Sequence, residues 1–333
     1  MKILIERNIP FVKGLLEPYA EVEYPTADEF TPDTVNDADA LLVRTRTRCD
    51  SRLLEGSRVS FIGTATIGTD HIDLPWCAAA GIEVANAPGC NAPAVGQYVL
   101  SAISRLTAGD PSGLTLGIVG VGHVGSIVER WARQCGLIVK LNDPPRQAAE
   151  GGDGWSTLEE IAAEADIITF HTPLDATTRH IVGREWMGSL RRKPIIINAA
   201  RGGIVDTPAL VEALDRGIVR DAVIDCWEGE PQISPALLER AAIATPHIAG
   251  YSHEGKVRAT RMAVDALCRH FGLPHIDMDQ HVPPGAADQM DLSTIAASYN
   301  PVADTIALKA SPGDFEQLRN HYILRHEPGA TGH

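Results

Sequence analysis

Short apolar runs alternate along the chain with longer segments in which apolar residues recur every three or four positions. Runs of the first kind predict buried strands, and segments of the second kind predict amphipathic helices. The apolar runs lie at 2–5, 38–45, 59–66, 81–84, 114–120, 137–143, 166–171, 194–200, 221–227 and 242–247. Because strand and helix signals alternate, the sequence predicts an α/β fold with a doubly wound parallel sheet.

Sequence signals indicate where several predicted helices begin or end. Residues 123–136 place apolar side chains at helical spacing, and Gly136 closes that helix. Ser156 and Glu159 have the spacing of a capping box, which predicts a helix start. The Asp206-Thr207-Pro208 segment opens another helix, because proline fits the first helical turn.

Changes in amino-acid composition divide the chain into regions. A loop with proline and glycine leads into a long amphipathic helix within 86–106, and we interpret this junction as a domain boundary. Residues 275–290 are polar and contain prolines, which predicts a linker. The segment 310–327 predicts one more helix.

Composition and charge narrow the class of protein. A chain of 333 residues suggests about two domains of ~150 residues each. The net charge of −14 argues against a nucleic-acid partner, which needs a basic face. No apolar run approaches the ~18 residues of a membrane span, so we expect no membrane partner. Six scattered cysteines contain no C-x-x-C pair, so we expect free thiols, no metal site and a cytoplasmic protein.

The segment GVGHVG carries the clearest motif of the sequence. Gly120, Gly122 and Gly125 follow a predicted strand, and with His123 and Val124 they open a predicted helix. This is the context of the dinucleotide-binding fingerprint, in which the glycines permit a tight turn and close approach of a pyrophosphate. Free N–H groups at the helix N-terminus then meet the negative charge. A glycine turn without a ligand is the alternative.

The end of the next strand indicates which dinucleotide binds. Asp143 lies at the end of the strand 137–143, eighteen positions after Gly125. A carboxylate there can accept hydrogen bonds from both ribose hydroxyls of NAD and repels the 2′-phosphate of NADP. Arg146 follows three residues later and slightly weakens that argument. The sequence therefore predicts NAD as the cofactor.

Three polar residues follow the ends of three other predicted strands. Arg201 lies in NAARGGIVD, Glu230 in DCWEGEP and His247 in TPHIAGY. In a doubly wound sheet those strand ends line the ligand crevice. A neutral histidine can take the hydroxyl proton of a 2-hydroxy acid as hydride leaves. A carboxylate behind the ring raises its pKa, and an arginine fork can hold the substrate carboxylate.

Each of these residues also has a structural interpretation. A single histidine is more often a surface or capping residue than a catalyst, Arg201 could cap a helix, and Glu230 could be solvated in its loop. Only their joint placement favours catalysis. Asp225 could face the nicotinamide amide or its ribose, and for His171 a structural role is favoured.

The motifs resemble those of the D-isomer specific 2-hydroxyacid dehydrogenases. The resemblance rests on GIVGVGHVGS, FHTPL, NAARGGIVD, DCWEGEP and TPHIAG, and on Asp143. The segments TATIGTDH, NDPPR and HIAGYSHEGK are similar to members of the family that oxidise a phosphorylated 2-hydroxy acid with NAD. The match runs from residue 1 to about 327.

The resemblance implies both an architecture and a set of site residues. It implies a flavodoxin-like substrate domain in 1–93 that a return helix in 254–275 completes, a Rossmann NAD-binding domain in 94–253, and an apparently shortened dimerisation region in 276–333, hence a homodimer. It implies Arg201 and Glu230 as active-site residues and His247 as proton donor and acceptor. The implied contacts are Thr45, Thr66 and Tyr251 for the substrate, and Asp143, Thr172, Asp225 and Gly250 for NAD.

The residues around Thr45 support an anionic substrate independently. Arg44 and Arg46 alternate with Thr45 along a predicted strand end, so the two arginines could share one face. Together with the Thr45 and Thr66 hydroxyls they suit a phosphorylated anion, and a solvated basic edge is the alternative. Two other functions stay open: a dehydrogenase for another 2-hydroxy acid such as 3-phosphoglycerate, and an NAD(H)-sensing scaffold.

Overall fold

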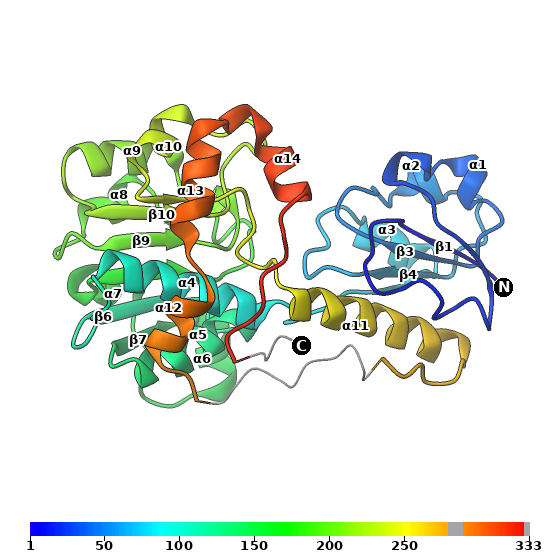
Figure 1. Cartoon of the computed structure of the whole chain (residues 1–333), viewed down its shortest axis with the longest axis horizontal. Coiled ribbons are helices and arrows are strands. Elements are labelled where there is room, and N and C mark those ends of the chain that lie inside the picture. The colour runs from blue at the N-terminus through cyan, green and yellow to red at the C-terminus, as the bar shows by residue number, and fades with distance from the viewer. Residues whose placement is uncertain (279–288, 330–333) are drawn as a thin grey trace. The chain divides into compact units, whose positions relative to one another are not determined.

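The computed structural model describes residues 1–278 and 289–329, and these residues form two compact units. The first unit joins Met1–Asn91 to the segment that starts at His253. The second joins Ala92–Ser252 to the C-terminal residues from 289 onward. Each unit is built on its own parallel sheet (Figure 1).

The first unit contains a five-stranded parallel sheet in the order β2-β1-β3-β4-β5. Its strands are β1 (Lys2–Ile5), β2 (Glu21–Glu23), β3 (Ala40–Val43), β4 (Phe61–Thr64) and β5 (Glu83–Ala85). Its helices are η1 (Ala27–Glu29), α1 (Pro32–Val35), α2 (Ser51–Leu54), α3 (Leu74–Ala79) and α11 (His253–Phe271). Apolar clusters cover both faces of the sheet, which explains why every residue of β3 and β4 is buried.

The second unit contains a six-stranded parallel sheet in the order β11-β10-β9-β8-β6-β7. The chain runs outward from β6 to β7 and then returns to place β8 on the other side of β6. This reversal confirms the predicted doubly wound sheet, and such a reversal is where ligands bind in these folds. The strands are β6 (Thr115–Val119), β7 (Ile138–Asn142), β8 (Ile167–Phe170), β9 (Ile195–Asn198), β10 (Asp221–Ile224) and β11 (Ile243–Ala244).

Helices cover both faces of this second sheet. They are α4 (Ala92–Leu106), α5 (His123–Gln134), α6 (Pro144–Glu150), α7 (Leu158–Glu164), α8 (Arg184–Gly188), η2 (Gly202–Ile204), α9 (Thr207–Asp215) and α10 (Pro235–Arg240). The prediction of an amphipathic helix within 86–106 was wrong in one respect. Residues 92–104 of α4 are all buried, because helices pack on it from more than one side.

Two predicted helix starts can be compared with the structure. The helix α7 is capped by Thr157 and Glu160, not by Ser156 and Glu159. The Thr157 hydroxyl accepts from the Glu160 N–H at 3.1 Å, and the Glu160 carboxylate accepts from the Thr157 N–H at 2.8 Å. The helix α9 is capped by Asp206, as the sequence predicted.

The C-terminal residues pack on the second unit as three short helices. These are α12 (Leu292–Ser298), α13 (Pro301–Ala310) and α14 (Phe315–Asn320), with η4 (Pro312–Asp314) before α14. The helix α12 contacts α4, and α13 contacts β11 (Figure 1). The predicted single helix over 310–327 was wrong, because Pro312-Gly313 delays its start and non-helical residues follow His321. Most of the predicted linker 275–290 lies outside the described residues.

Among the described residues, no helix has both the length and the apolar character needed to cross a membrane.

Candidate active site

The carboxyl ends of the strands in the second unit carry most of the predicted site residues. Because the strands are parallel, these ends meet at one edge of the sheet. Residues follow the strands as predicted: Gly120 after β6, Asp143 after β7, Thr172 after β8, Arg201 after β9, Asp225 after β10 and His247 after β11.

The glycine-rich loop needs glycine at two positions for different reasons. Gly120 has φ +88°, and a Cβ on it would lie 2.7 Å from the backbone of His171. A Cβ on Gly125 would overlap the carbonyl oxygen of Gly120, so α5 starts directly against the turn. At Gly122 a Cβ would enter open space, which leaves room for a ligand to approach the backbone before His123.

Asp143 is held against this loop by two backbone donors. Its Oδ2 accepts from the Val121 N–H at 2.8 Å, and its Oδ1 accepts from the Arg146 N–H at 3.0 Å. The Arg146 guanidinium donates to the Val121 carbonyl at 2.7 Å and pairs with Glu150 at 2.8 Å. Asp143 therefore sits at the loop where the fingerprint predicts a ribose, and Arg146 is already neutralised by a neighbouring carboxylate.

The end of β8 closes the opposite side of the glycine-rich loop. The Thr172 hydroxyl is buried and has no hydrogen-bond partner among the described residues. Its backbone N would lie 2.8 Å from a Cβ on Gly120, so the hydroxyl belongs to the same loop cluster. A buried orphan hydroxyl beside a glycine cradle fits a polar ligand such as NAD. Burial lowers the pKa of His171 to about 3, so His171 stays neutral, and its Nε2 pairs with the Thr169 hydroxyl at 3.0 Å.

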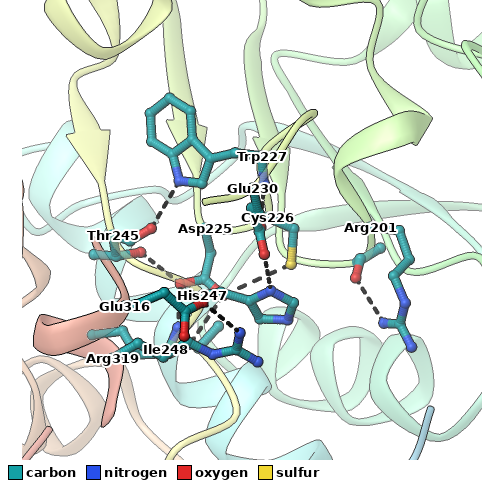
Figure 2. A network of polar contacts seen from close by, with 12 residues as sticks. Arg201, Asp225, Cys226, Trp227, Glu230, Thr245, His247, Ile248, Glu316 and Arg319 are labelled. Atoms are coloured by element: carbon teal, nitrogen blue, oxygen red, sulfur yellow. Dashed lines mark hydrogen bonds and ion pairs between the residues drawn. The ribbon is translucent and has the colours of Figure 1, made fainter. Parts of the chain in front are cut away.

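His247 and Glu230 form the closest pair of predicted catalytic residues. The His247 Nδ1 and Glu230 Oε2 atoms are 2.8 Å apart, and Figure 2 shows the imidazole directed at the carboxylate. The other carboxylate oxygen, Oε1, accepts from the Trp227 N–H at 2.7 Å. The two side chains are 29% and 20% exposed, so water screens their interaction only in part.

Burial and charge act in opposite directions on this pair. Burial would lower the pKa of His247, but Glu230 and the sulfur of Cys226 outweigh it, and the pKa is raised well above 6.5. Burial would likewise raise the pKa of Glu230, but the hydrogen bonds from His247 and Trp227 hold it below its usual range. Because burial raises the pKa of the Cys226 thiol, Glu230 is the charge that stabilises the imidazolium.

Arg201 reaches the same region through a loop that packs on the Glu230 loop. Arg201 precedes η2, and a Cβ on Gly202 would overlap the Trp227 carbonyl group. The Asn198 amide donates to the carbonyl groups of Arg201 at 3.0 Å and Cys226 at 3.2 Å. Figure 2 draws the Arg201 side chain apart from the His247 ring, with its Nη1 donating to the Ala200 carbonyl at 2.9 Å.

Asp225 supports the loop that carries His247. Its Oδ1 accepts from the Thr245 hydroxyl at 2.7 Å and from the Ile248 N–H at 2.8 Å, and its Oδ2 accepts from the Ala249 N–H at 3.0 Å. His247 itself has φ +57°, a strained backbone state that its neighbours must stabilise. Asp225 thereby fixes both sides of His247, and a contact from Asp225 to the nicotinamide stays a prediction.

Two arginines in the C-terminal segment, which the sequence analysis did not select, also contact this loop. Arg325 donates to the carbonyl groups of Ile248 at 3.0 Å and Tyr251 at 3.1 Å, and to that of Ala249. Arg319 donates to the Tyr251 hydroxyl at 3.2 Å. Gly250 lies inside the same loop. No local pattern marks these arginines, because their partners in this loop lie far earlier in the chain.

The remaining predicted substrate residues belong to the first unit. Arg44, Thr45 and Arg46 follow β3, and Thr66 follows β4. The idea that Arg44 and Arg46 share a strand face was wrong, because β3 ends at Val43 and the two residues lie in a turn. The Arg44 Nη1 donates to the Asn8 carbonyl at 3.0 Å, and the Thr66 hydroxyl lies 2.7 Å from that of Thr64.

Comparisons with known proteins identify the family of this chain. Residues 95–249 match the family model of the D-isomer specific 2-hydroxyacid dehydrogenase, NAD binding domain. Erythronate-4-phosphate dehydrogenase of Bacteroides thetaiotaomicron is 47% identical, with 99% of this chain and 98% of that protein covered. The enzyme of the same name from Porphyromonas gingivalis is 41% identical, with 97% of this chain and 92% of that protein covered.

Solved structures show the same fold. The TT0316 protein from Thermus thermophilus matches with a TM-score of 0.71 at 29% identity, covering 83% of this chain and 98% of that chain. D-lactate dehydrogenase from Aquifex aeolicus, solved with NAD and lactic acid, matches with a TM-score of 0.67 at 24% identity, covering 82% and 96%.

Replacing Glu230 with Gln tests the origin of the His247 pKa. The Gln oxygen can still accept from Trp227, but it carries no charge, so burial then dominates and the pKa of His247 falls. We expect NMR titration of the imidazole Cε1–H to show this fall. The exposed Glu239→Gln variant serves as the control and leaves the His247 titration unchanged. An unchanged His247 pKa in Glu230→Gln contradicts the assignment of Glu230 as the stabilising charge.

Proposed function

We propose that this chain, which belongs to the erythronate-4-phosphate dehydrogenases of the D-isomer specific 2-hydroxyacid dehydrogenase family, oxidises 4-phospho-D-erythronate at C2. The products are 3-hydroxy-2-oxo-4-phosphooxybutanoate, NADH and a proton, in a step of pyridoxal 5′-phosphate (vitamin B6) biosynthesis. The chain is an NAD-dependent oxidoreductase. The observation that carries the proposal is the 2.8 Å contact between His247 and Glu230 at the strand ends beside the glycine-rich loop.

The residues that would hold NAD are those of the glycine-rich loop and the neighbouring strand ends. They are Gly120, Gly122, His123, Val124, Gly125, Asp143, Thr172, Asp225 and Gly250. Support comes from the room beside Gly122 and from the buried Thr172 hydroxyl that lacks a partner among the described residues. Bound NAD supplies the hydride acceptor, and the chain's own residues handle the proton and the charge of the substrate.

Proton transfer follows from the paired side chains. In its neutral form His247 accepts the C2 hydroxyl proton, and Glu230 stabilises the imidazolium that results. Because Glu230 holds Nδ1, the proton is exchanged at Nε2. The raised pKa of His247 means that oxidation becomes faster as the pH rises through that pKa, since only the neutral ring accepts a proton.

The substrate is an anion at both ends, and arginines hold it. Arg201 receives the C1 carboxylate and draws charge from the C2 oxygen, as a guanidinium fork does in other sites. Thr45, Thr66 and Tyr251 contact the substrate, and Arg44 and Arg46 add positive charge beside Thr45.

We assign the chain to the cytoplasm, with all six of its cysteines free in support.

The central test is steady-state oxidation of 4-phosphoerythronate by NAD, with 3-phosphoglycerate as the competing substrate. We expect NADH production mainly from 4-phosphoerythronate, and His247→Ala should lower kcat roughly 100-fold or more while NAD affinity changes little. Preference for 3-phosphoglycerate assigns a different substrate. Absence of NADH from every 2-hydroxy acid, with NAD binding intact, favours an NAD(H)-sensing scaffold. A His247→Ala variant with near-normal turnover removes His247 from the mechanism.

Cofactor choice is tested at Asp143. Asp143→Ala removes the acceptor for the ribose hydroxyls and the charge that repels a 2′-phosphate, so the ratio of kcat/KM for NAD to that for NADP should fall about tenfold. The exposed Asp110→Ala variant controls for the loss of one carboxylate. If the ratio is the same in Asp143→Ala and in the unchanged protein, Asp143 does not select the cofactor.

We also propose that the C-terminal segment forms a homodimer. Val302 and Ile306 on α13 are 38% and 65% exposed, and Ile323 is 89% exposed. Val302 and Ile306 are four positions apart and so share one face of α13, and Ile323 lines a surface pocket together with Ala303 and Ala307 of the same helix. Exposed apolar side chains grouped in this way are typical of protein interfaces.

Light scattering on a sizing column measures the oligomeric state directly. We expect a dimer, and the double variant Ile306→Glu with Ile323→Glu should be a monomer because two buried charges oppose association. Ile138→Glu is the matched control, since Ile138 is 55% exposed on β7, outside this segment. A dimer that survives the double variant uses a different surface.

A further inference from the structure

Helix α14 brings another guanidinium to the catalytic pair. Arg319 Nε donates to the Tyr251 hydroxyl at 3.2 Å, and its charge also acts on the Glu230 carboxylate. Figure 2 draws Arg319 and Glu316 in one network of polar contacts with Glu230 and His247. The Arg319 side chain is 20% exposed, so its positive charge is largely shielded from water.

Few of the N–H donors of Arg319 have a hydrogen-bond partner among the described residues. A guanidinium has five N–H donors. Among the described residues Arg319 makes one hydrogen bond, to Tyr251, and one ion pair, in which its Nη1 lies 3.8 Å from Glu316 Oε1. That separation is too long for a hydrogen bond. Arg325 on the same segment differs, because its nitrogens all donate to partners in the chain, among them Gln97 at 2.8 Å.

The Arg319 guanidinium keeps N–H donors available beside a tyrosine hydroxyl, and this arrangement is suited to bind a tetrahedral oxyanion. Arginine binds phosphate with two parallel N–H bonds, and a hydroxyl can add a third donor. The ion pair with Glu316 shows that the Arg319 guanidinium already attracts a negatively charged group on this side. Its side chain is 39% exposed and can turn into water when a stronger anion arrives.

We propose that Arg319 and Tyr251 together bind the phosphate group of the substrate. This inference rests on the proposed function, in which Arg201 receives the carboxylate at the opposite end. Only C3 and C4 separate C2 from the phosphate ester oxygen, so the phosphate must bind close to the residue that takes the C2 proton. Tyr251 follows His247 by four positions in one fixed loop, and Arg319 is bonded to Tyr251. Arg319 thus selects for phosphorylated over unphosphorylated 2-hydroxy acids.

Two inhibitors separate the phosphate from the carboxylate. Glycerol 3-phosphate carries only the phosphate, and erythronate carries only the carboxylate. In Arg319→Met we expect the inhibition constant of glycerol 3-phosphate to rise at least tenfold and that of erythronate to change less than twofold. The KM for 4-phosphoerythronate should rise at least tenfold, with a smaller change in kcat. Arg319→Lys keeps a charge without the fork and should fall between the two.

A second substitution is expected to act in the opposite direction. Glu316→Gln removes the carboxylate that competes for Arg319, so glycerol 3-phosphate should bind more tightly, by about twofold to fivefold. The control is Arg216→Met, because Arg216 is exposed and pairs with Glu212 at 3.0 Å in a similar helical arrangement. It should change neither inhibition constant.

Several results overturn the inference. Equal weakening of both inhibitors in Arg319→Met places Arg319 at the carboxylate or in a general structural role. Unchanged glycerol 3-phosphate inhibition in Arg319→Met and Arg319→Lys, both with a melting temperature close to that of the unchanged protein, removes Arg319 from the phosphate site. If the unchanged protein does not oxidise 4-phosphoerythronate, the proposed function fails, and calorimetric binding of glycerol 3-phosphate to the same variants still decides the role of Arg319.

Discussion

The hydrogen bond between His247 and Glu230 is the interaction on which the rest of the site depends. It joins two loops that follow neighbouring strands, and it sets the charge of the imidazole in a half-buried place. The surrounding contacts hold the Glu230 loop and the His247 loop in fixed positions. The Trp227 N–H fixes the carboxylate, and Asp225 holds the backbone on both sides of the strained His247. Gly202 lets the Arg201 loop pack directly on them. A parallel sheet supplies this arrangement because its strand ends share one edge.

The C-terminal segment extends this site beyond the sheet. In the second unit, Arg325 donates to carbonyl groups of Ile248 and Tyr251 in the loop after His247, and it ties the C-terminal segment to that loop. Arg319 contributes charge rather than backbone support. The two arginines, six positions apart, therefore do different work: one stabilises the shape of the loop, and the other is placed to bind an anion. The family model ends at residue 249 and includes neither arginine.

Local signals explain what the sequence could predict and what it could not. The glycine-rich turn and the polar residues at strand ends follow from short patterns, so the sheet and the neighbourhood of Glu230 and His247 were predictable. The extent of the helix predicted over 310–327 was not predictable, because the spacing of apolar residues in a short segment does not show where tertiary contacts end the helix. The turn after Val43 likewise ended a strand that the apolar run suggested was longer. Arg325 and its carbonyl partners are joined only by tertiary folding, which no spacing rule encodes.

The position of Arg325 in the chain has a consequence for synthesis. Arg325 follows Ile248 by 77 residues, so a ribosome has made the whole parallel sheet before the residue that holds the histidine loop exists. Domains fold from the N-terminus as they emerge. Until residue 325 has been translated, the loop after His247 lacks the contacts that Arg325 makes to the carbonyl groups of Ile248 and Tyr251. The order of translation therefore places the strands of the sheet before the residue that ties the C-terminal segment to this loop.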